Sequence, residues 1–503
     1  MEENQKALDC GIIQGISNTK EKVSFSRLEC IYAYLMFAIG FCFMRFVLWN
    51  VTGIFTTIFF IGTAFVCLYY LKKNNYKFYN IHKIIFGLIM IFSLVFSITA
   101  NSFIKSLDIV FLLMLGSYWV YAVCKENKDI ERFFFFDMLK AVMVMPFLSF
   151  GKTLQVIVSS TSRSKAGNTI KLVLLGLVVT IPLTMVVALL LISADSGVEA
   201  VLNAVFGNVF QYSFITIVQF TMGIPVALYL FGMLYSNVNK VKANVLTEEQ
   251  TAHKLESIKI FPNLVMYSAV TPVCILYILF FILQIRYFIS AFTGILPEAY
   301  SYAEYARRGF FELCFTAVIN LMILIFINFL SKQSGENKPV LLKVYNVLIS
   351  VFTILLLTTA LSKMILYISN YGLTQLRVYT SWFMLLLAIV NVLIIMKQFR
   401  ANFNFAKYAV LVFVFLFGVL CFSNVDGNIA RYNIKMYQAG YLKELDVDAL
   451  CNLSDDALVY VLKEKIDIND RLDWLIDFYH NNPGYTYNLS SFRVKLLLEK
   501  NQE

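Results

Sequence analysis

The chain has 503 residues and a formal net charge of +10, with 59% hydrophobic, 16% aromatic and 15% charged residues. Soluble domains average roughly 25% charged residues, so this composition excludes an ordinary soluble enzyme and indicates that lipid is the main solvent. The basic residues are dispersed among the loops beside apolar runs rather than gathered on one face, which argues against nucleic acid as a partner.

Apolar runs recur along the whole chain, and a transmembrane helix needs about 20 mostly apolar residues. They predict an all-α, polytopic transmembrane helix bundle with about eleven spans and room for only one small soluble piece. The first 28 residues lack an apolar core followed by a cleavage site, so no cleaved signal peptide is expected. In chain order, the predicted spans are residues 29–49, 52–71, 84–104, 107–124, 171–193, 212–235, 264–291, 309–330, 344–367, 378–397 and 407–423.

Lys and Arg residues accumulate in alternate gaps between these spans. The second gap holds Lys72, Lys73 and Lys77, for example, whereas residues 194–211 contain no Lys or Arg. Because basic residues mark cytoplasmic loops, the pattern predicts a cytoplasmic N-terminus and an outer C-terminus. The predicted parts are a cytoplasmic tail (1–28), four transmembrane helices (29–124), a cytoplasmic segment (125–170), a seven-helix core (171–423) and an outer acidic helical tail (424–503).

The predicted cytoplasmic segment contains an apolar stretch that could be counted as a further span. Residues 133–150 are rich in Phe and Met but include Asp137, Lys140 and Pro146. Residues 131–160 are therefore interpreted as an amphipathic helix on the inner membrane surface. A re-entrant or spanning segment is the alternative.

No pattern of residues in the chain predicts a metal or cofactor site. His82, His253 and His480 are widely separated, and the nine cysteines include no CxxC pair. The outer tail is acidic, and its apolar residues recur at helical spacing, which predicts two or three short helices. This tail is a candidate surface for an envelope protein partner.

Ionisable residues inside spans are costly and invite a functional hypothesis. Arg286, Glu312, Lys363 and Arg377 all lie near the predicted outer ends of spans. Three interpretations stay open: an ion-pair clamp between helices, a vestibule for an anionic solute, lipid headgroup or peptide, and a proton or ion relay. The candidate vestibule comprises Arg286, Glu304, Arg307, Arg308, Glu312, Lys363, Tyr371, Gly372, Thr374 and Arg377.

The loop before residue 378 predicts a tight turn followed by a capped helix. Gly372 allows the reversal, Thr374 can cap the next helix, and Arg377 can hold a carboxylate or phosphate. Pro182, Pro225 and Pro272 fall in consecutive predicted spans and hint at the discontinuous helices of a transporter.

Several strings resemble a family of bacterial multi-spanning membrane proteins that is known only as a domain of unknown function. They are AEYARRGFFEL at 303–313, YGLTQLRVYTSWF at 371–383, IARYN at 429–433, LYILFFILQIRYF at 276–288 and LSDDAL at 453–458. The resemblance covers roughly residues 170–460 and implies an integral membrane protein without an established reaction. The family signature maps onto Glu304, Tyr305, Arg307, Arg308, Gly309, Glu312, Tyr371, Gly372, Thr374, Arg377, Arg431, Tyr432 and Asn433.

The leading hypothesis is a non-enzymatic protein of the bacterial cytoplasmic membrane that transports a small solute or a lipid-linked molecule through an outward-facing vestibule. It predicts membrane lipid as a partner and no cofactor. One alternative is an envelope sensor, accessory or scaffold subunit whose tail (424–503) receives a ligand or partner. The other is a membrane-embedded enzyme that uses Glu304 or Glu312 as a general base against a lipid-linked substrate.

Overall fold

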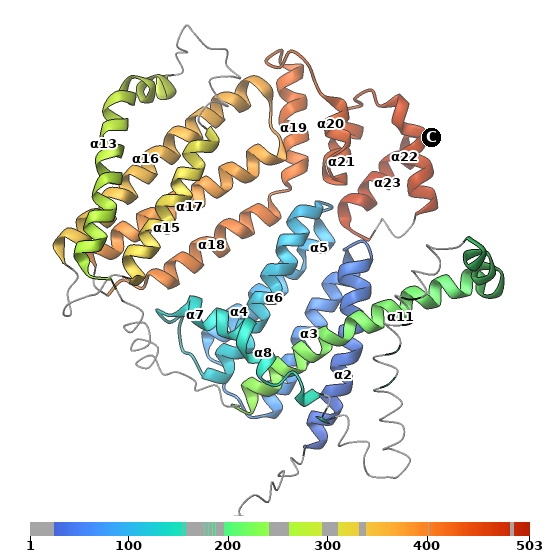
Figure 1. Ribbon diagram of the computed structural model, residues 1–503. Helices are drawn as coiled ribbons and strands as arrows, with labels where there is room; N and C mark the ends of the chain where they lie inside the picture. The colour runs from blue at the N-terminus through green and yellow to red at the C-terminus, as the bar shows by residue number, and fades with distance from the viewer. Residues whose placement is uncertain are drawn as a thin grey trace, which may run out of the picture. The chain divides into compact units, whose positions relative to one another are not determined.

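The computed structural model is helical throughout the residues that it describes (Figure 1). These residues are 25–153, 155–156, 196–240, 261–293, 310–330, 339–400, 402–482 and 487–502, with a few isolated positions between 176 and 187. Among them, ten helices are long and apolar enough to cross a membrane. The prediction of an all-α polytopic bundle is confirmed, although most of the predicted span 171–193 lies outside the described residues.

Two compact units make up the chain, and the first falls within Met1–Phe41 and Ser149–Gly232. In this unit, helix α2 (Arg27–Phe43) crosses helix α11 (Ser196–Val238) at two glycines. A Cβ atom on Gly40 would lie only 2.4 Å from the carbonyl oxygen of Gly223. Small residues at such a crossing let the two backbones approach closely, which is a common way to pack helices in a membrane.

The second unit comprises Cys42–Leu148 and Met233–Glu503. Its first helices pack through aromatic rings that are buried between spans. Phe92 of α4, for example, stacks on Phe417 of α18 (Phe405–Phe422) with ring centroids 5.7 Å apart, and Phe111 of α6 contacts the same ring at 5.1 Å. These helices are η1 (Met44–Trp49), α3 (Ile54–Lys73), α4 (Asn80–Ser93), α5 (Val95–Ile98) and α6 (Ser102–Lys125).

One loop lies several residues earlier than the sequence predicts. The predicted spans 84–104 and 107–124 are separated in the structure at residues 99–101, between α5 and α6. The Asn101 side chain accepts a hydrogen bond from the Ile104 amide at 2.9 Å and thereby caps α6. As a result, Lys105 and Asp108 belong to a transmembrane helix rather than to a loop or its edge.

A second group of spans is joined by hydrogen bonds between polar side chains. Asn320 of α15 accepts from the Tyr277 hydroxyl and donates to Thr353 of α16 at 3.0 Å, while Asn328 donates to Asn346 at 2.8 Å. Such bonds help to hold helices together in a membrane, because the hydrophobic effect does not drive helices to associate in lipid. The helices are α13 (Asn263–Thr293), α15 (Phe310–Leu330), α16 (Val340–Tyr371), α17 (Gln375–Phe399) and α18 (Phe405–Phe422).

The prediction that three prolines mark discontinuous helices is wrong for Pro225 and Pro272, the two of the three that the structure describes. Pro225 lies inside α11 and Pro272 lies inside α13, and both helices are continuous through the proline. Neighbouring helices and local adjustments can accommodate the missing hydrogen bond in a membrane span. The predicted kink at Pro182 falls outside the described residues.

The segment predicted to be cytoplasmic begins with a short, irregular helical stretch. It consists of α7 (Phe134–Leu139), the π-helical η2 (Lys140–Val144) and α8 (Met145–Leu148). This stretch is not among the ten candidate spans of the described chain. Its placement on the inner membrane surface stays a prediction.

The tail after residue 423 is helical, as the spacing of its apolar residues predicts, but its described residues form five helices rather than two or three, with a core of their own. Leu458, Leu475 and Val494 come from three of these helices and are buried together. This core lets the tail pack as a unit against the ends of the spans. Its helices are α19 (Val425–Gln438), α20 (Val447–Cys451), α21 (Asp455–Lys463), α22 (Asn469–Asn481) and α23 (Leu489–Gln502).

Candidate functional site

A cluster of buried polar groups joins the tail to the ends of the spans. We call it the outer junction because the sequence predicts that the tail lies on the outer side, and it consists of Thr99, Asn101, Asp426, Ser454, Asp456 and Ser490, all of them less than 9% exposed except Ser454. The tail contributes two carboxylates, and the α5–α6 turn contributes hydrogen-bond donors. Because buried polar groups must be paired to avoid a large desolvation cost, the cluster fixes the tail in one position.

Asp456 lies in the first turn of α21 and is 2% exposed. Its carboxylate accepts hydrogen bonds from the Thr99 hydroxyl, the Ala100 amide at 3.1 Å and the Ser490 hydroxyl. Burial raises the pKa of Asp456, and these hydrogen bonds oppose that rise because they stabilise the charged form. One carboxylate thus connects the α5–α6 turn, α21 and α23.

Asp426 lies in the first turn of α19 and is fully buried. Its carboxylate accepts from Asn101 Nδ2 at 2.8 Å and from Gln375 Nε2 at 2.8 Å, so it connects α19 to both α6 and α17. The Ser454 hydroxyl lies 2.5 Å from an Asp426 oxygen and 3.4 Å from an Asp456 oxygen. This hydroxyl therefore bridges the two carboxyl groups.

Two ionisable residues lie in the first two turns of span α6, directly after the outer junction. Lys105 is 3% exposed, donates to the Thr52 carbonyl at 2.5 Å and interacts electrostatically with Asp456. Asp108 lies one turn deeper, is completely buried, and neither of its oxygens has a hydrogen-bond partner among the described residues. We refer to Asp426, Asp456, Lys105 and Asp108 as the ionisable column.

Span α6 is the most buried of the ten candidate spans. In the apolar stretch of α6, 67% of the residues are buried, whereas the corresponding share is at most 44% in each of the other nine candidate spans of the described chain. The C-terminal end of α6 carries a second charged group, in which Lys125 pairs with Glu131 at 2.6 Å and with Asp137 at 2.9 Å, and the Tyr121 hydroxyl donates to Asp137. Between Asp108 and Tyr121 the helix rises about 20 Å.

Four residues of the predicted vestibule meet at the turn between α16 and α17. The Arg377 guanidinium donates to the carbonyls of Tyr371, at 2.9 Å, and Gly372, and it lies 4.2 Å from the centroid of the Tyr367 ring. Thr374 accepts from the Arg377 amide at 3.4 Å, so it caps α17 as the sequence predicts. Here Arg377 donates to the carbonyls at the end of α16.

The turn is also tied to the tail through two of the strings that carry the family resemblance. Asn433 of α19 accepts from the Leu373 amide at 2.7 Å and donates to the Leu373 carbonyl at 2.9 Å. Gly372 has φ of +74°, and a Cβ atom there would lie 2.6 Å from Asn433 Oδ1. Both the backbone conformation and the close approach therefore require glycine.

The remaining predicted site residues are only partly described. Glu312 interacts electrostatically with Lys363, and it lines an apolar hollow with Phe315, Val318 and other neighbours. Glu304, Arg307 and Arg308 lie outside the described residues, as does the side chain of Arg286. The predicted vestibule therefore stays a prediction.

The sequence interpretation missed the ionisable column because it placed the third loop too late. Lys105 and Asp108 then fell between or at the edge of two predicted spans, and Asp456 was grouped with the other acidic residues of the tail. Thr99 and Asn101, which can both cap a helix, are the local signal for an earlier loop. Among the described residues, no three His, Cys, Asp or Glu side chains are arranged to hold a metal ion.

The fold and these buried contacts define a polytopic α-helical membrane protein whose helical tail is held to the ends of its spans by hydrogen bonds. A family model, described as a domain of unknown function (DUF4153), matches residues 86–464. The chain therefore belongs to the DUF4153 family. No curated protein and no solved structure matches the chain.

Proposed function

We propose that this protein transports a small solute or a lipid-linked molecule across the bacterial cytoplasmic membrane, and that the ionisable column moves protons during transport. The observation that carries the proposal is Asp108, a completely buried carboxyl group without a hydrogen-bond partner among the described residues of a span. Carboxyl groups inside spans are costly and are typical of proton relays in pumps and transporters. This proposal replaces the outward vestibule with a site on α6.

The neighbours of Asp108 suit proton exchange with the outer side. Lys105 is one turn away on the same helix, and it interacts electrostatically with Asp456 of the outer junction. Towards the inner side, the buried residues Leu112 and Leu115 separate Asp108 from the next polar side chains along α6, Ser117, Tyr118 and Tyr121, and the helix rises about 14 Å between Asp108 and Ser117. This apolar interval is too long for one proton transfer, so it would act as the barrier that a transporter needs between its two sides.

Proton movement in proteoliposomes tests this function without a known substrate. The protein would be reconstituted with the pH-sensitive dye pyranine inside, and a potassium diffusion potential with valinomycin would drive proton entry. We expect faster acidification with the wild type than in empty liposomes and loss of that difference in Asp108→Asn, because the amide cannot exchange a proton.

The matched control is Asp448→Asn, which makes the same change at an exposed tail residue. It should retain the wild-type rate. Two results contradict the proposal: a wild type no faster than empty liposomes, and an Asp108→Asn variant as fast as the wild type while both proteins elute as single folded species.

The outer junction favours a second candidate function, an envelope sensor or accessory subunit. Asp426 and Asp456 connect the tail to α5, α6 and α17, so a partner or ligand bound to residues 424–503 would act directly on the spans. Co-purification from crosslinked envelopes tests it. A partner retained by the full chain and lost when the chain ends at Ser423 supports this function, and the absence of any retained partner counts against it.

A further inference from the structure

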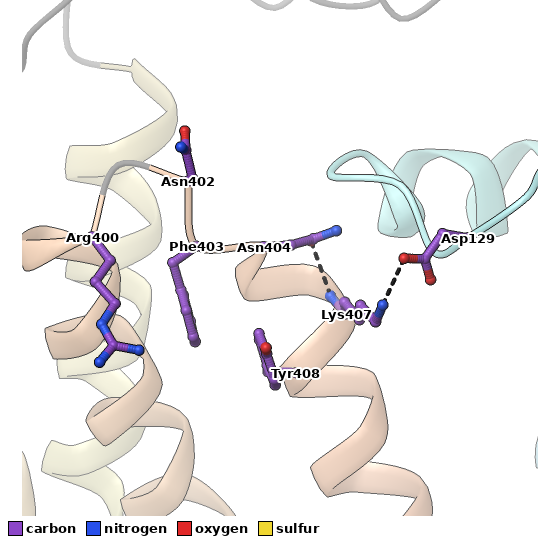
Figure 2. A pocket seen from close by; sticks show the side chains of 7 residues that line it. All are labelled: Asp129, Arg400, Asn402, Phe403, Asn404, Lys407 and Tyr408. Atoms are coloured by element: carbon purple, nitrogen blue, oxygen red, sulfur yellow. Dashed lines mark hydrogen bonds and ion pairs between the residues drawn. The ribbon is translucent and has the colours of Figure 1, made fainter.

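A polar pocket lies beside the turn between α17 and α18, among the loops that the sequence places on the cytoplasmic side (Figure 2). The cavity measures about 550 Å³. Its lining combines two cationic side chains, one carboxylate, two amides and two aromatic rings. The lining residues are Asp129, Arg400, Asn402, Phe403, Asn404, Lys407 and Tyr408.

The two cations of the pocket have different surroundings. Lys407 pairs with Asp129 at 2.6 Å, and this contact lowers the pKa of the Asp129 carboxyl. Arg400 is exposed and has no acceptor within hydrogen-bond distance in the described part of the chain. Figure 2 shows Arg400 on one side of the Phe403 and Tyr408 rings and the Lys407–Asp129 pair on the other.

Further positive charge surrounds the pocket. Lys397, one turn before Arg400 in α17, interacts electrostatically with Arg132, a residue of like charge. The Lys397 ammonium group also lies 5.6 Å from the centroid of the Phe405 ring, next to Asn404 of the lining. Because like charges held close together repel each other, a bound anion would stabilise this arrangement.

We infer that this pocket binds the headgroup of an anionic phospholipid of the inner leaflet. Arg400 is placed to hold the phosphodiester, because its planar guanidinium can donate two parallel hydrogen bonds to phosphate oxygens. The Tyr408 hydroxyl can donate to the same headgroup. This binding does not depend on the transport proposal.

A lipid fits better than free phosphate because an apolar surface continues from the pocket along α18. Tyr408, Leu411 and Phe415 are 45%, 50% and 70% exposed and recur at i, i+3 and i+7, so they form one stripe on the helix surface. Acyl chains can cover this stripe while the headgroup occupies the pocket. Basic residues at the inner membrane surface attract anionic lipids in the same way.

Binding of a fluorescent phosphatidylglycerol to the full-length protein in a neutral detergent tests the inference. We expect Arg400→Gln to weaken binding about tenfold, since it removes charge-assisted hydrogen bonds to the phosphate. Asp129→Asn should tighten binding, because it removes the negative charge from the pocket. Arg431→Gln, the same change at an exposed arginine of the tail, serves as the control and should bind like the wild type.

Two competitors distinguish the source of the phosphate group. Unlabelled phosphatidylglycerol should displace the probe, and phosphatidylcholine should displace it much less well. Inorganic phosphate at millimolar concentration should have little effect. The inference is wrong if Arg400→Gln binds the probe like the wild type, if the two lipids compete equally, or if inorganic phosphate competes as well as phosphatidylglycerol.

Discussion

Charged groups have opposite surroundings in the outer junction and in the polar pocket beside the α17–α18 turn, which we call the inner pocket because the sequence predicts that its loops are cytoplasmic. In the outer junction, Asp426 and Asp456 are at most 2% exposed and receive hydrogen bonds from neutral hydroxyl and amide groups. In the inner pocket, the Lys407 and Asp129 side chains are 35% and 56% exposed and form an ion pair. Buried carboxylates cannot be re-solvated without separating the helices, whereas exposed ion pairs exchange readily with water.

This difference suggests that the two ends of the bundle have different tasks. A buried and fully bonded junction holds the tail in one position, since loss of any partner leaves a polar group unsatisfied. An exposed pocket whose arginine has no hydrogen-bond acceptor among the described residues can exchange one ligand for another at little cost. The outer junction should therefore be rigid, and the inner pocket should be adaptable.

The largest effect is expected from Asp456→Ala. It removes the acceptor for Thr99, Ala100 and Ser490, and at about 1 kcal/mol for each hydrogen bond the docked tail should lose on the order of 3 kcal/mol. Hydrogen–deuterium exchange in α21 and α23 would measure this loss as faster exchange. The matched control is Asp448→Ala in α20, which removes an exposed ion pair to Arg471 and should cost under about 0.5 kcal/mol. Equal exchange in the two variants would show that the outer junction does not hold the tail.

A smaller effect is expected where the tail contacts the α16–α17 turn. Asn433→Ala removes two hydrogen bonds to Leu373 and should cost about 2 kcal/mol. Limited proteolysis at the turn would detect the loss as faster cleavage. Gln438→Ala, an exposed position on the same helix, should be cleaved at the wild-type rate. A slower or unchanged rate in Asn433→Ala would contradict the role of Asn433 as a clamp.

The two regions should also respond to pH with opposite sign. Burial raises the pKa of Asp456, so the folded state binds this proton more tightly than the unfolded state does, and the contribution of Asp456 to stability falls as pH rises above about 4. The pKa of Asp129 is lowered by Lys407, so its contribution is present above about pH 4 and disappears as pH falls through the lowered pKa.

Thermal melts from about pH 2 to about pH 7 would compare each Asn variant with the wild type, a range that covers the ordinary pKa of aspartic acid, about 4, and the region below it in which the Asp129 contribution is lost. Relative to the wild type, Asp456→Asn should gain stability as pH rises, whereas Asp129→Asn should lose stability. For Asp129→Asn, stability relative to the wild type should change only slightly with pH, because the Lys407–Asp129 ion pair is exposed. Slopes of the same sign would contradict the comparison between the two ends.

The smallest effect is expected from Lys407→Gln in the inner pocket. This variant removes an ion pair that is more than one-third exposed and should lower stability by no more than about 0.5 kcal/mol. The melting temperature in detergent would measure the change. A loss as large as that of Asp456→Ala would mean that the inner pocket is as rigid as the outer junction.

Much of the fold could be predicted from hydropathy, because lipid requires every span to be a long apolar helix. Helix α18 and the tail core follow directly from their apolar spacing. The position of the α5–α6 turn could not be predicted in this way, since residues 84–124 are apolar almost throughout and only the capping contacts of Asn101 place the break.

The site was harder to predict because its residues owe their role to partners distant in the chain. Asp456 meets Thr99 across 357 positions, and Asn433 meets Leu373 across 60. In the sequence, Arg377 reads as a free cation near the end of a span. Only the structure shows that its guanidinium is occupied by the carbonyls of Tyr371 and Gly372.

The proposal that Asp108 exchanges a proton inside the membrane is the central claim, and infrared spectroscopy tests it most directly. Difference spectra of the reconstituted wild type across a pH titration should contain a carboxyl C=O band that appears and disappears, and that band should be missing from Asp108→Asn. A band that persists unchanged in Asp108→Asn, or a wild type with no titrating carboxyl band assigned to Asp108, would contradict the account.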